Sequence, residues 1–559
     1  MDRCHLSDEP LTLHSQRNRN GFSESHAAGF VVRDKCRSIF LMAMLAVSAV
    51  PLGCRGKHAS LTIPGPNAEA LKHMAEGDAH FQKSHLYGWR QAEVSYRDAY
   101  ELTASAEAKR KLLLTRFLLF IRQIDEDIPN PGADETIHEL CAGDDARENL
   151  CAIAQWYGKG KNSSRPDILT GSIFGGEYPE LEAYFNYLLS NSGPLDESAP
   201  KLETLIHQFG ESPLFLYLDL GKLIKRDPAE MESSYPHFAE AFEFMAESLF
   251  QKKKYRTARM YFQKAIDLIP DYTRPMNGLG NIYFFGLEDY ERALRCYESA
   301  LGRDPTNTAA LFGKGAVLHK LGRYPESNAT LDRMLATDLL RNGRITGAGY
   351  LYYSGEGNYL KAYNYFLMNE PARAREFIDA ARQFQPDSEE IVELSGVLHF
   401  RAQKLEEARR DFLDVISKGN SNCNAQMNLG LVYLRMKESG VEPPPESSGK
   451  DGVKGYLETW SLRNEPAEKK SLNYFLGAGS CMESAIRYLN GQISSVPALD
   501  LEPAEKTFLQ NKLQYKLKDA RVTYASNIET MLEESTENLF ASGTYLDLLR
   551  EILARVRGQ

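Results

Sequence analysis

Apolar residues recur at spacings of three and four along most of the chain, which is the period of an amphipathic helix. Such segments occupy residues 110–124, 134–157, 179–191 and 198–226, and helical patterning continues from residue 238 towards the C-terminus. No segment alternates apolar and polar residues as a half-buried strand would. The pattern predicts an all-α protein.

One apolar run does not follow this helical pattern. Residues 39–53, IFLMAMLAVSAVPLG, follow a charged segment and precede Cys54. The run is shorter than the about 20 residues that a membrane-spanning helix needs. A basic segment, a short apolar core and small residues before a cysteine are typical of a secretory signal. An uncleaved membrane anchor and a cytosolic protein with a buried apolar segment remain alternatives.

The sequence Leu52-Gly53-Cys54 resembles a bacterial lipobox, with Pro51 where that motif has an aliphatic residue. The resemblance implies that Cys54 is lipidated and becomes the first residue of an exported protein held at a membrane, with Arg55 pointing to the outer membrane. Initiation at Val31 or Val32 would give this signal a conventional length. We therefore predict a signal-containing extension over residues 1–54 and a tether over residues 55–66.

Small residues and aromatics recur about every 34 residues from residue 238 onward, a period typical of helical repeats. This pattern resembles the tetratricopeptide repeat, which has small residues at positions 8, 20 and 27, large ones at 11 and 24, and proline at 32. The first clear copy matches at Ala246, Leu249, Ala258, Phe262, Ala265 and Pro270. Further copies, less complete, run towards Pro305, Leu339, Pro386 and Asn420, and a sixth begins at Asn428.

Small residues at positions 8 and 20 let two antiparallel helices approach closely, and proline at 32 cannot continue the second helix. One such pair cannot bury its apolar face alone, so the pairs stack on one another. We therefore predict a right-handed superhelical solenoid, with the repeat array at residues 237–436.

The flanking regions are less regular. Residues 67–236 are predicted to form irregular helical hairpins, with one degenerate repeat at 68–103. Residues 437–465, rich in proline, serine and glycine, are predicted to form a flexible loop between two helices. Residues 466–559 are predicted to form a helical cap that covers the end of the solenoid. A partner-docking role for the last helix is the alternative.

The composition and net charge of the chain argue against several classes of protein. The chain has 559 residues and a net charge of −10, and no local basic patch stands out, so we expect no nucleic-acid partner. The 8 cysteines include no CxxC pair, which argues against zinc-ribbon and thioredoxin-like folds. Cys141 and Cys151 either bridge or stay free, and free thiols are favoured because ten residues of continuous helix would separate them.

The sequence contains no complete catalytic motif, so we expect that the protein is not an enzyme and that it binds no cofactor and no metal. His138-Glu139 lacks the second histidine of a zinc protease motif, and GAGSC at 477–481 is not a nucleophile elbow. His73, His80 and His85 could share one side of a helix and its turn. They lack an acidic or thiol companion, so a metal site there is disfavoured.

In the tetratricopeptide family, positions 2, 5, 9, 12 and 13 of each first helix face the concave groove. By that resemblance the candidate partner-binding residues are Glu243, Glu247, Phe250, Asn277, Asn281, Phe284, Phe285, Phe312, Tyr359, Tyr363, Phe366 and Phe400. Glu240, His319 and Glu393 occupy positions of the same kind. The lining is aromatic with an acidic end, so a peptide with apolar or aromatic side chains is the expected guest. Cover by the N-terminal region or the inserted loop is the alternative.

These features predict a non-enzymatic, lipid-anchored scaffold of the bacterial cell envelope that faces the periplasm and binds a protein or peptide. The envelope role rests on resemblance to repeat lipoproteins. The alternative is a periplasmic accessory subunit of a transporter, whose solenoid encloses an apolar pocket. The sequence does not indicate an oligomeric state.

Overall fold

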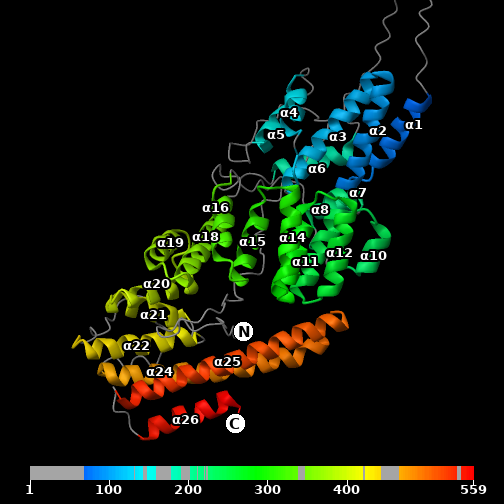
Figure 1. The fold of residues 1–559 in the computed structure, drawn as a ribbon. Coiled ribbons are helices and arrows are strands. Elements are labelled where there is room, and N and C mark those ends of the chain that lie inside the picture. Colours follow the sequence, from blue (N-terminus) through cyan, green and yellow to red (C-terminus); the bar gives the residue numbers. More distant parts are fainter. Residues whose placement is uncertain are drawn as a thin grey trace, which may run out of the picture.

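The protein is an elongated assembly of helices (Figure 1). The computed structural model describes residues 68–126, 128–130, 132–142, 148–158, 178–190, 202–210, 212–219, 221, 225–337, 347–418, 422–441, 465–537 and 543–558. Every regular element in these ranges is helical. The predicted all-α solenoid is confirmed.

Three groups of helices follow one another along the chain. The N-terminal group comprises α1 (Ala68–Phe81), α2 (Leu86–Thr103), α3 (Ala106–Asp125), α4 (Ala133–Cys141), α5 (Glu148–Gly158), α6 (Pro179–Ser190), α7 (Leu202–Phe209), α8 (Pro213–Leu218) and α10 (Pro228–Ser234). The repeat array comprises α11 (Ala239–Gln251), α12 (Tyr255–Leu268), α13 (Thr273–Asn281) with the π-helical turn Ile282–Gly286, α14 (Tyr290–Arg303), α15 (Thr308–Lys320), α16 (Tyr324–Leu335), α18 (Gly347–Leu367), α19 (Pro371–Phe384), α20 (Glu389–Arg401), α21 (Leu405–Lys418) and α22 (Cys423–Glu438). The C-terminal group comprises α24 (Ala467–Ser495), the 3-10 turn Val496–Ala498, α25 (Pro503–Glu537) and α26 (Gly543–Arg557).

Glycine lets the helices of a pair approach closely. A β-carbon at Gly280 would lie 2.6 Å from the Tyr297 ring, so only glycine fits between α13 and α14. The same contact recurs in the N-terminal group, where a β-carbon at Gly77 would lie 2.5 Å from the ring of Tyr96. The pair α1 and α2, predicted to be a degenerate repeat, is therefore packed like a regular one.

The sixth pair of the array is completed across an insertion. The Ser471 hydroxyl on α24 donates to the carbonyl of Gly430 on α22 at 2.8 Å. In the third pair the Ser327 hydroxyl donates to the carbonyl of Gly315 at the same 2.8 Å. Helix α24 thus serves as the second helix of the pair that α22 begins. Most of the predicted inserted loop, residues 442–464, lies outside the described residues.

The turns within successive pairs share one backbone feature. A residue with positive φ joins the first helix to the second at Lys253, Glu288, Gly322, Asn369 and Gln403. This left-handed conformation reverses the chain within a short connection. The turn within each of these pairs therefore has the same type of backbone conformation.

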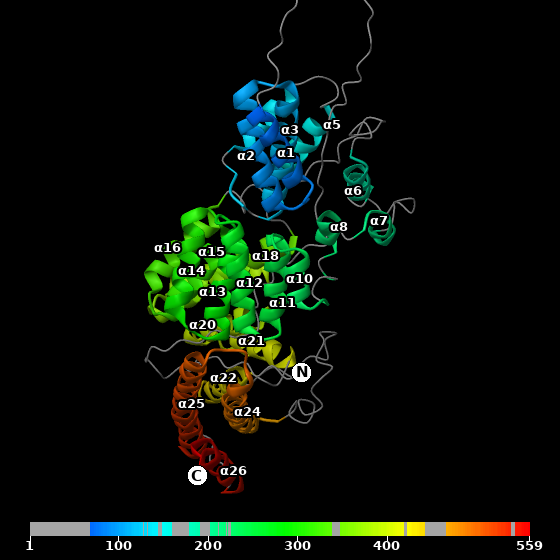
Figure 2. The same ribbon diagram turned by 90° about the vertical axis from the view of Figure 1, so that its right-hand side faces the viewer.

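The C-terminal helices run back along the array instead of ending at its last repeat (Figures 1 and 2). The backbone amide of Arg256, at the start of α12, donates to the carbonyl of Asp500 at 2.8 Å. Val496, Leu501, Leu509 and Leu513 share one buried apolar cluster with Tyr255 and Leu287 of the first two pairs. Helices α24 and α25 therefore connect the last pair of the array to the first.

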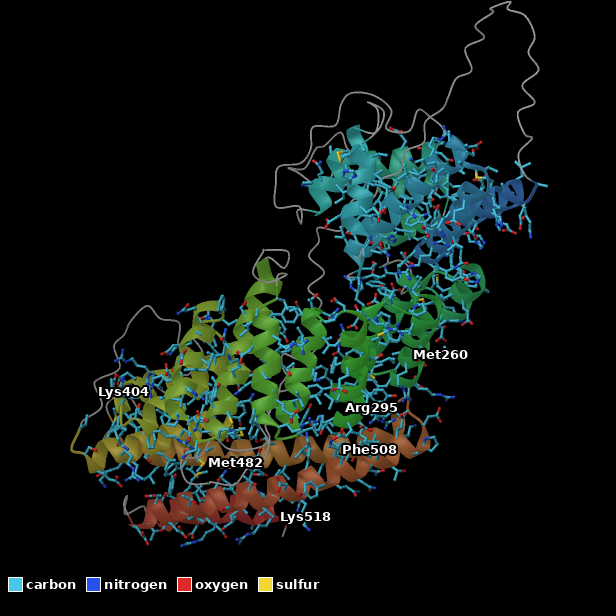
Figure 3. The ribbon with its side chains drawn as sticks, turned by 45° about the horizontal axis from the view of Figure 1, so that its top comes forward. Met260, Arg295, Lys404, Met482, Phe508 and Lys518 are labelled. Carbon is cyan, nitrogen blue, oxygen red and sulfur yellow. A yellow bond between two sulfur atoms is a disulfide. The ribbon has the colours of Figure 1, made fainter. Side chains whose placement is uncertain are left out.

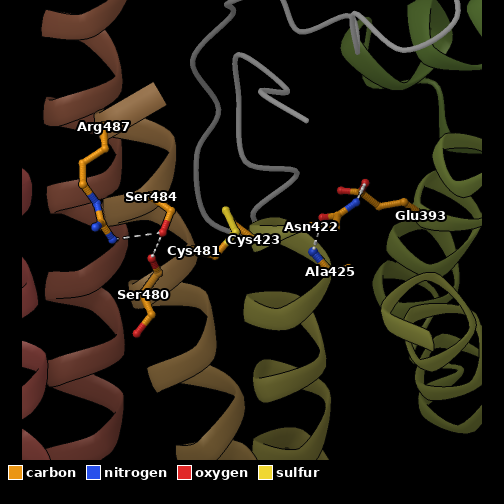
Figure 4. The surroundings of a disulfide bond; sticks show 8 residues. All are labelled: Glu393, Asn422, Cys423, Ala425, Ser480, Cys481, Ser484 and Arg487. Atoms are coloured by element: carbon orange, nitrogen blue, oxygen red, sulfur yellow. Dashed lines mark hydrogen bonds between the residues drawn. A yellow bond between two sulfur atoms is a disulfide. The ribbon is translucent and has the colours of Figure 1, made fainter. Parts of the chain in front are cut away.

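Two disulfides link described cysteines. Cys423 on α22 is bonded to Cys481 on α24, which ties the sixth pair together (Figure 4). Cys141 is bonded to Cys151, so the favoured prediction of two free thiols is wrong. That prediction assumed one helix over residues 134–157. The chain instead forms two helices, α4 and α5, that contact each other and bring the sulfur atoms together.

Candidate partner-binding groove

The acidic end of the predicted groove is covered by the N-terminal group. Glu240 on α11 is fully buried. Its carboxylate pairs with Arg122 of α3, with Arg122 Nη1 3.2 Å from Glu240 Oε1, and accepts a hydrogen bond from the amide of Leu86 at 3.1 Å. The Arg122 guanidinium also lies 3.4 Å from the ring centre of Tyr217. An external guest therefore cannot reach Glu240 while α2 and α3 stay in place.

A second buried carboxylate extends this contact. Glu126, just after α3, is fully buried and accepts hydrogen bonds from the hydroxyls of Tyr217 and Tyr272. The guanidinium of Arg274 on α13 lies 2.7 Å from the same carboxylate. Burial raises the pKa of both tyrosines well above the usual range. Both hydroxyls therefore stay protonated and serve as donors.

Sequence reasoning missed Arg122 and Glu126. A signal was present, because Arg122 directly follows the apolar residues 117–121, where an unpaired charge would be costly to bury. Its partner could not be inferred, because Glu240 lies far away along the chain.

The two predicted asparagines support the array itself. Asn277 donates to the side-chain oxygen of Asn307 at 3.1 Å, and Asn307 in turn caps α15. Asn281 accepts from the Tyr297 hydroxyl at 2.7 Å. Glu243 is buried, and Glu247 is half-buried and accepts from Gln251 at 2.9 Å.

Most of the predicted aromatic residues are buried. The buried ones are Phe250, Phe284, Tyr363, Phe366 and Phe400. The Phe284 ring meets that of Phe285 edge-on, with 4.5 Å between their centres. Two of the others contact the neighbouring first helix: Tyr363 on α18 lies 5.3 Å from the ring of His319 on α15, and Phe366 lies 4.1 Å from the guanidinium of Arg401 on α20. These rings therefore contribute to packing within the array. Whether any of them also binds a partner stays a prediction.

Three of the predicted rings remain half-buried: those of Phe285, Phe312 and Tyr359. Phe312 on α15 lies 5.7 Å from the ring of Tyr352 and 5.8 Å from that of Tyr353, both half-buried on α18. We call Phe312, Tyr352 and Tyr353 the aromatic triad. It joins the third and fourth pairs, and each of its three residues is only partly buried.

Two titratable groups on the same helix faces are fully enclosed. Burial lowers the pKa of His319 to about 3, and its ring nitrogen Nδ1 lies 2.6 Å from Asn364 Oδ1. Burial raises the pKa of Glu393 to about 7, although the hydrogen bond that Asn422 donates to it at 2.6 Å acts to lower this pKa. The groove therefore contains a neutral imidazole and a carboxyl group that ionises near neutral pH.

The predicted histidine cluster has a structural use. His85 Nδ1 accepts a hydrogen bond from the amide of Gly88 at 3.0 Å and so caps α2. His80 Nδ1 lies 3.2 Å from the ammonium group of Lys83. Across the described part of the chain, no group of three or more metal-ligating side chains is placed to hold an ion.

The predicted lipidation site, Cys54, lies outside the described residues, as does the apolar run before it. Within the ranges that are described, none of the helices combines the length and apolar character needed to cross a bilayer.

Comparison with known proteins identifies the repeats. Residues 239–272 and 282–339 each match a family described as tetratricopeptide repeat. The chain therefore contains tetratricopeptide repeats within an all-helical solenoid, a fold that supports binding of a protein or peptide. The bovine BBSome complex member BBS4 is 24% identical over 195 residues, covering 31% of this chain and only 37% of that protein.

Solved repeat structures resemble parts of the chain only loosely. The pilF protein of Pseudomonas aeruginosa has a TM-score of 0.31 and 17% identity, covering 37% of this chain and 93% of that one. YrrB, described as having an unusual peptide-binding site, has a TM-score of 0.27 and 21% identity, covering 38% and 91%. The Cut9–Hcn1 assembly of the APC/C has a TM-score of 0.35 and 10% identity, covering 87% of each chain. Similarity at this level transfers no partner to this chain.

Proposed function

We propose that this chain is a non-enzymatic scaffold of the bacterial cell envelope that binds a protein partner at the aromatic triad on its repeat array. The half-buried rings of Phe312, Tyr352 and Tyr353 carry the proposal. Aromatic side chains that keep accessible ring surface contribute strongly to protein interfaces. The acidic end of the groove is occupied from within the chain, so the guest is expected to be apolar or aromatic.

The disulfides support an exported location. Four of the five described cysteines form disulfide bonds, and Cys296 is the remaining free thiol among them. Disulfides persist mainly in oxidising compartments such as the periplasm. Together with the apolar run and Cys54 they favour an exported, lipid-anchored protein.

Affinity capture from detergent-solubilised envelopes tests the binding role. The variant Phe312→Ala, Tyr353→Ala should keep its helix content and lose the protein that the unchanged chain captures. Met260→Ala is the matched control, because Met260 is 51% exposed on α12, far from the triad in sequence. Undiminished capture by the double variant, with an unchanged circular dichroism spectrum, would refute binding at the triad.

Lipidation is tested separately. Cys54→Ser should abolish labelling by a clickable fatty acid and shift the protein from the membrane fraction to the soluble periplasmic fraction. Cys296→Ser is the control, since it removes a thiol that lies within the repeats. The lipid anchor would be excluded if Cys54→Ser stays in the membrane fraction and the unchanged protein takes up no fatty-acid label.

A further inference from the structure

Helices α22 and α24 pack side by side in opposite directions. Three contacts set their register, and these pair Gly430 with Ser471, Gln426 with Gly477 and Cys423 with Cys481. Residue numbers fall along α22 as they rise along α24. Since Cys423 is the first residue of α22, the disulfide lies where α24 leaves the last pair of the array.

The segment beyond the disulfide reaches from the last pair to the first. We call residues 482–537 the strap, and Figure 3 labels Met482 at its start and Phe508 on α25. Near Phe508, Glu505 pairs with Arg259 of α12. The strap is therefore attached at two places: covalently to α22 through the residue before it, and by polar and apolar contacts to the first pairs.

The attachment to the first pair depends on close polar contacts. The backbone amides of Arg256 and Thr257 donate to the carbonyl and the carboxylate of Asp500, at 2.8 Å and 3.0 Å. At about 1.5 Å per residue, about 21 Å of helix separates Cys481 from Ser495. A tilt of about 10° at Cys481 therefore moves Ser495 by about 4 Å, which is enough to break both hydrogen bonds.

The disulfide opposes such a tilt because Cys423 is itself held in place. The bond keeps the Cα atoms of Cys423 and Cys481 5.3 Å apart. Asn422, which precedes Cys423, accepts a hydrogen bond from the amide of Ala425 at 2.8 Å and donates one to Glu393 of α20 at 2.6 Å (Figure 4). The disulfide thus joins the origin of the strap to a helix end that the fifth pair holds.

We propose that the Cys423–Cys481 disulfide is a redox latch, whose formation fixes the strap against the first pairs and whose reduction increases opening of that contact. The proposal goes beyond partner binding, since it concerns how the array is held closed by its own C-terminal helices. Disulfides persist mainly in oxidising compartments. The closed arrangement is then completed when the chain reaches such a compartment.

Reduction of the latch by a dithiol is a balanced exchange. A thiolate of the dithiol attacks Cys481 Sγ, because Cys481 is half-buried whereas Cys423 is only 6% exposed. The sulfur–sulfur bond breaks, and Cys423 leaves with the electron pair as a thiolate at the N-terminus of α22, where the helix dipole stabilises negative charge. The second thiol of the reagent then displaces Cys481, so the reagent is oxidised to a disulfide and the protein takes up its two protons.

Hydrogen exchange of the purified full-length protein in detergent tests the latch. Cys423→Ser combined with Cys481→Ser should make peptides 254–259 and 503–516 exchange about tenfold faster, because the distant end of the strap opens more often. Cys141→Ser combined with Cys151→Ser is the matched control, since it removes the disulfide between α4 and α5 and should leave both peptides unchanged. No partner is present, so the outcome does not depend on the aromatic triad.

Reversible reduction gives a second measurement that needs no change at the latch. In the Cys141→Ser, Cys151→Ser variant, dithiothreitol should give the same faster exchange in peptides 254–259 and 503–516, and reoxidation should restore the slow rate. The latch is refuted if reduction changes only peptides next to Cys423 and Cys481, or changes none. Loss of helix content on reduction would also refute it, because release of a latch leaves the array folded.

Discussion

At the scale of single residues, burial decides which predicted features bind and which support the fold. Ala258 and the aromatic residues predicted to line the groove illustrate the difference. Ala258 was identified as a packing position from the repeat pattern, and it is fully buried. Phe284 and Phe400 were identified as groove residues, yet they too lie in the core. The repeat pattern shows which face of a helix a residue occupies, but it does not show how closely the next helix approaches.

Packing at Ala258 can be measured directly. Ala258→Leu should overpack the contact between α11 and α12 and lower the free energy of unfolding by about 1–3 kcal/mol. Met260→Leu on the same helix is the control, because that side chain is 51% exposed. Equal denaturant midpoints for the two variants would show that Ala258 does not lie at a tight helix contact.

Glu393 predicts a dependence of stability on pH. Burial raises its pKa to about 7 in the folded protein, above the usual value of 4.5. The folded state therefore favours the protonated carboxyl, and the penalty for ionising it grows as pH rises from about 4.5 to about 7. Glu393→Gln should consequently be more stable than the unchanged protein at pH 8 and equal to it near pH 4.5.

Denaturation curves at the two pH values measure this difference. Each unit of pKa shift corresponds to about 1.4 kcal/mol, so the gain at pH 8 should exceed 1 kcal/mol. Glu376→Gln, at an exposed site on α19, should show no such gain. A Glu393→Gln effect that is the same at both pH values would mean that Glu393 titrates normally.

At the scale of elements, the repeats could be predicted and their long-range contacts could not. The tetratricopeptide pattern indicated paired helices because spacing within about 34 residues carries that information. The return of α25 to the first repeats depends on pairs such as Arg259 with Glu505, whose partners are far apart in sequence. The contact of Arg122 with Glu240 was hidden for the same reason.

The charged contact between α25 and the first repeats should control local opening. Although burial acts to raise the pKa of Glu288, the ammonium groups of Lys516 and Lys512 lower it, so this carboxylate is ionised.

Glu505→Gln removes the charge that pairs with Arg259 and Arg292. It should reduce the free energy of opening for residues 503–516 by about 1–2 kcal/mol.

Hydrogen exchange followed by mass spectrometry measures that opening. Peptides from residues 254–259 and 503–516 should exchange faster in Glu505→Gln, while peptides from α22 and α24, joined by the Cys423–Cys481 disulfide, should not change. Glu551→Gln on α26 is the control, since its side chain is 66% exposed. Unchanged exchange in both test peptides would show that the apolar contacts alone hold α25.

At the scale of the whole molecule, the N-terminal and C-terminal helices of the chain both pack against its repeat array. The N-terminal helices cover the acidic end of the groove, and α24 and α25 connect the last pair to the first. The aromatic triad between α15 and α18 lies between these two contacts along the chain. This arrangement leaves the middle of the array as the place where a partner is expected to bind.

Site-specific photocrosslinking in intact cells tests that claim most directly. A photoreactive phenylalanine analogue at position 312 should trap a distinct protein, and the same analogue at position 260 should trap none. The adduct should disappear when Tyr353→Ala is added and should remain when Glu551→Gln is added. If position 312 gives no adduct, or gives the same adducts as position 260, the aromatic triad is not the binding surface.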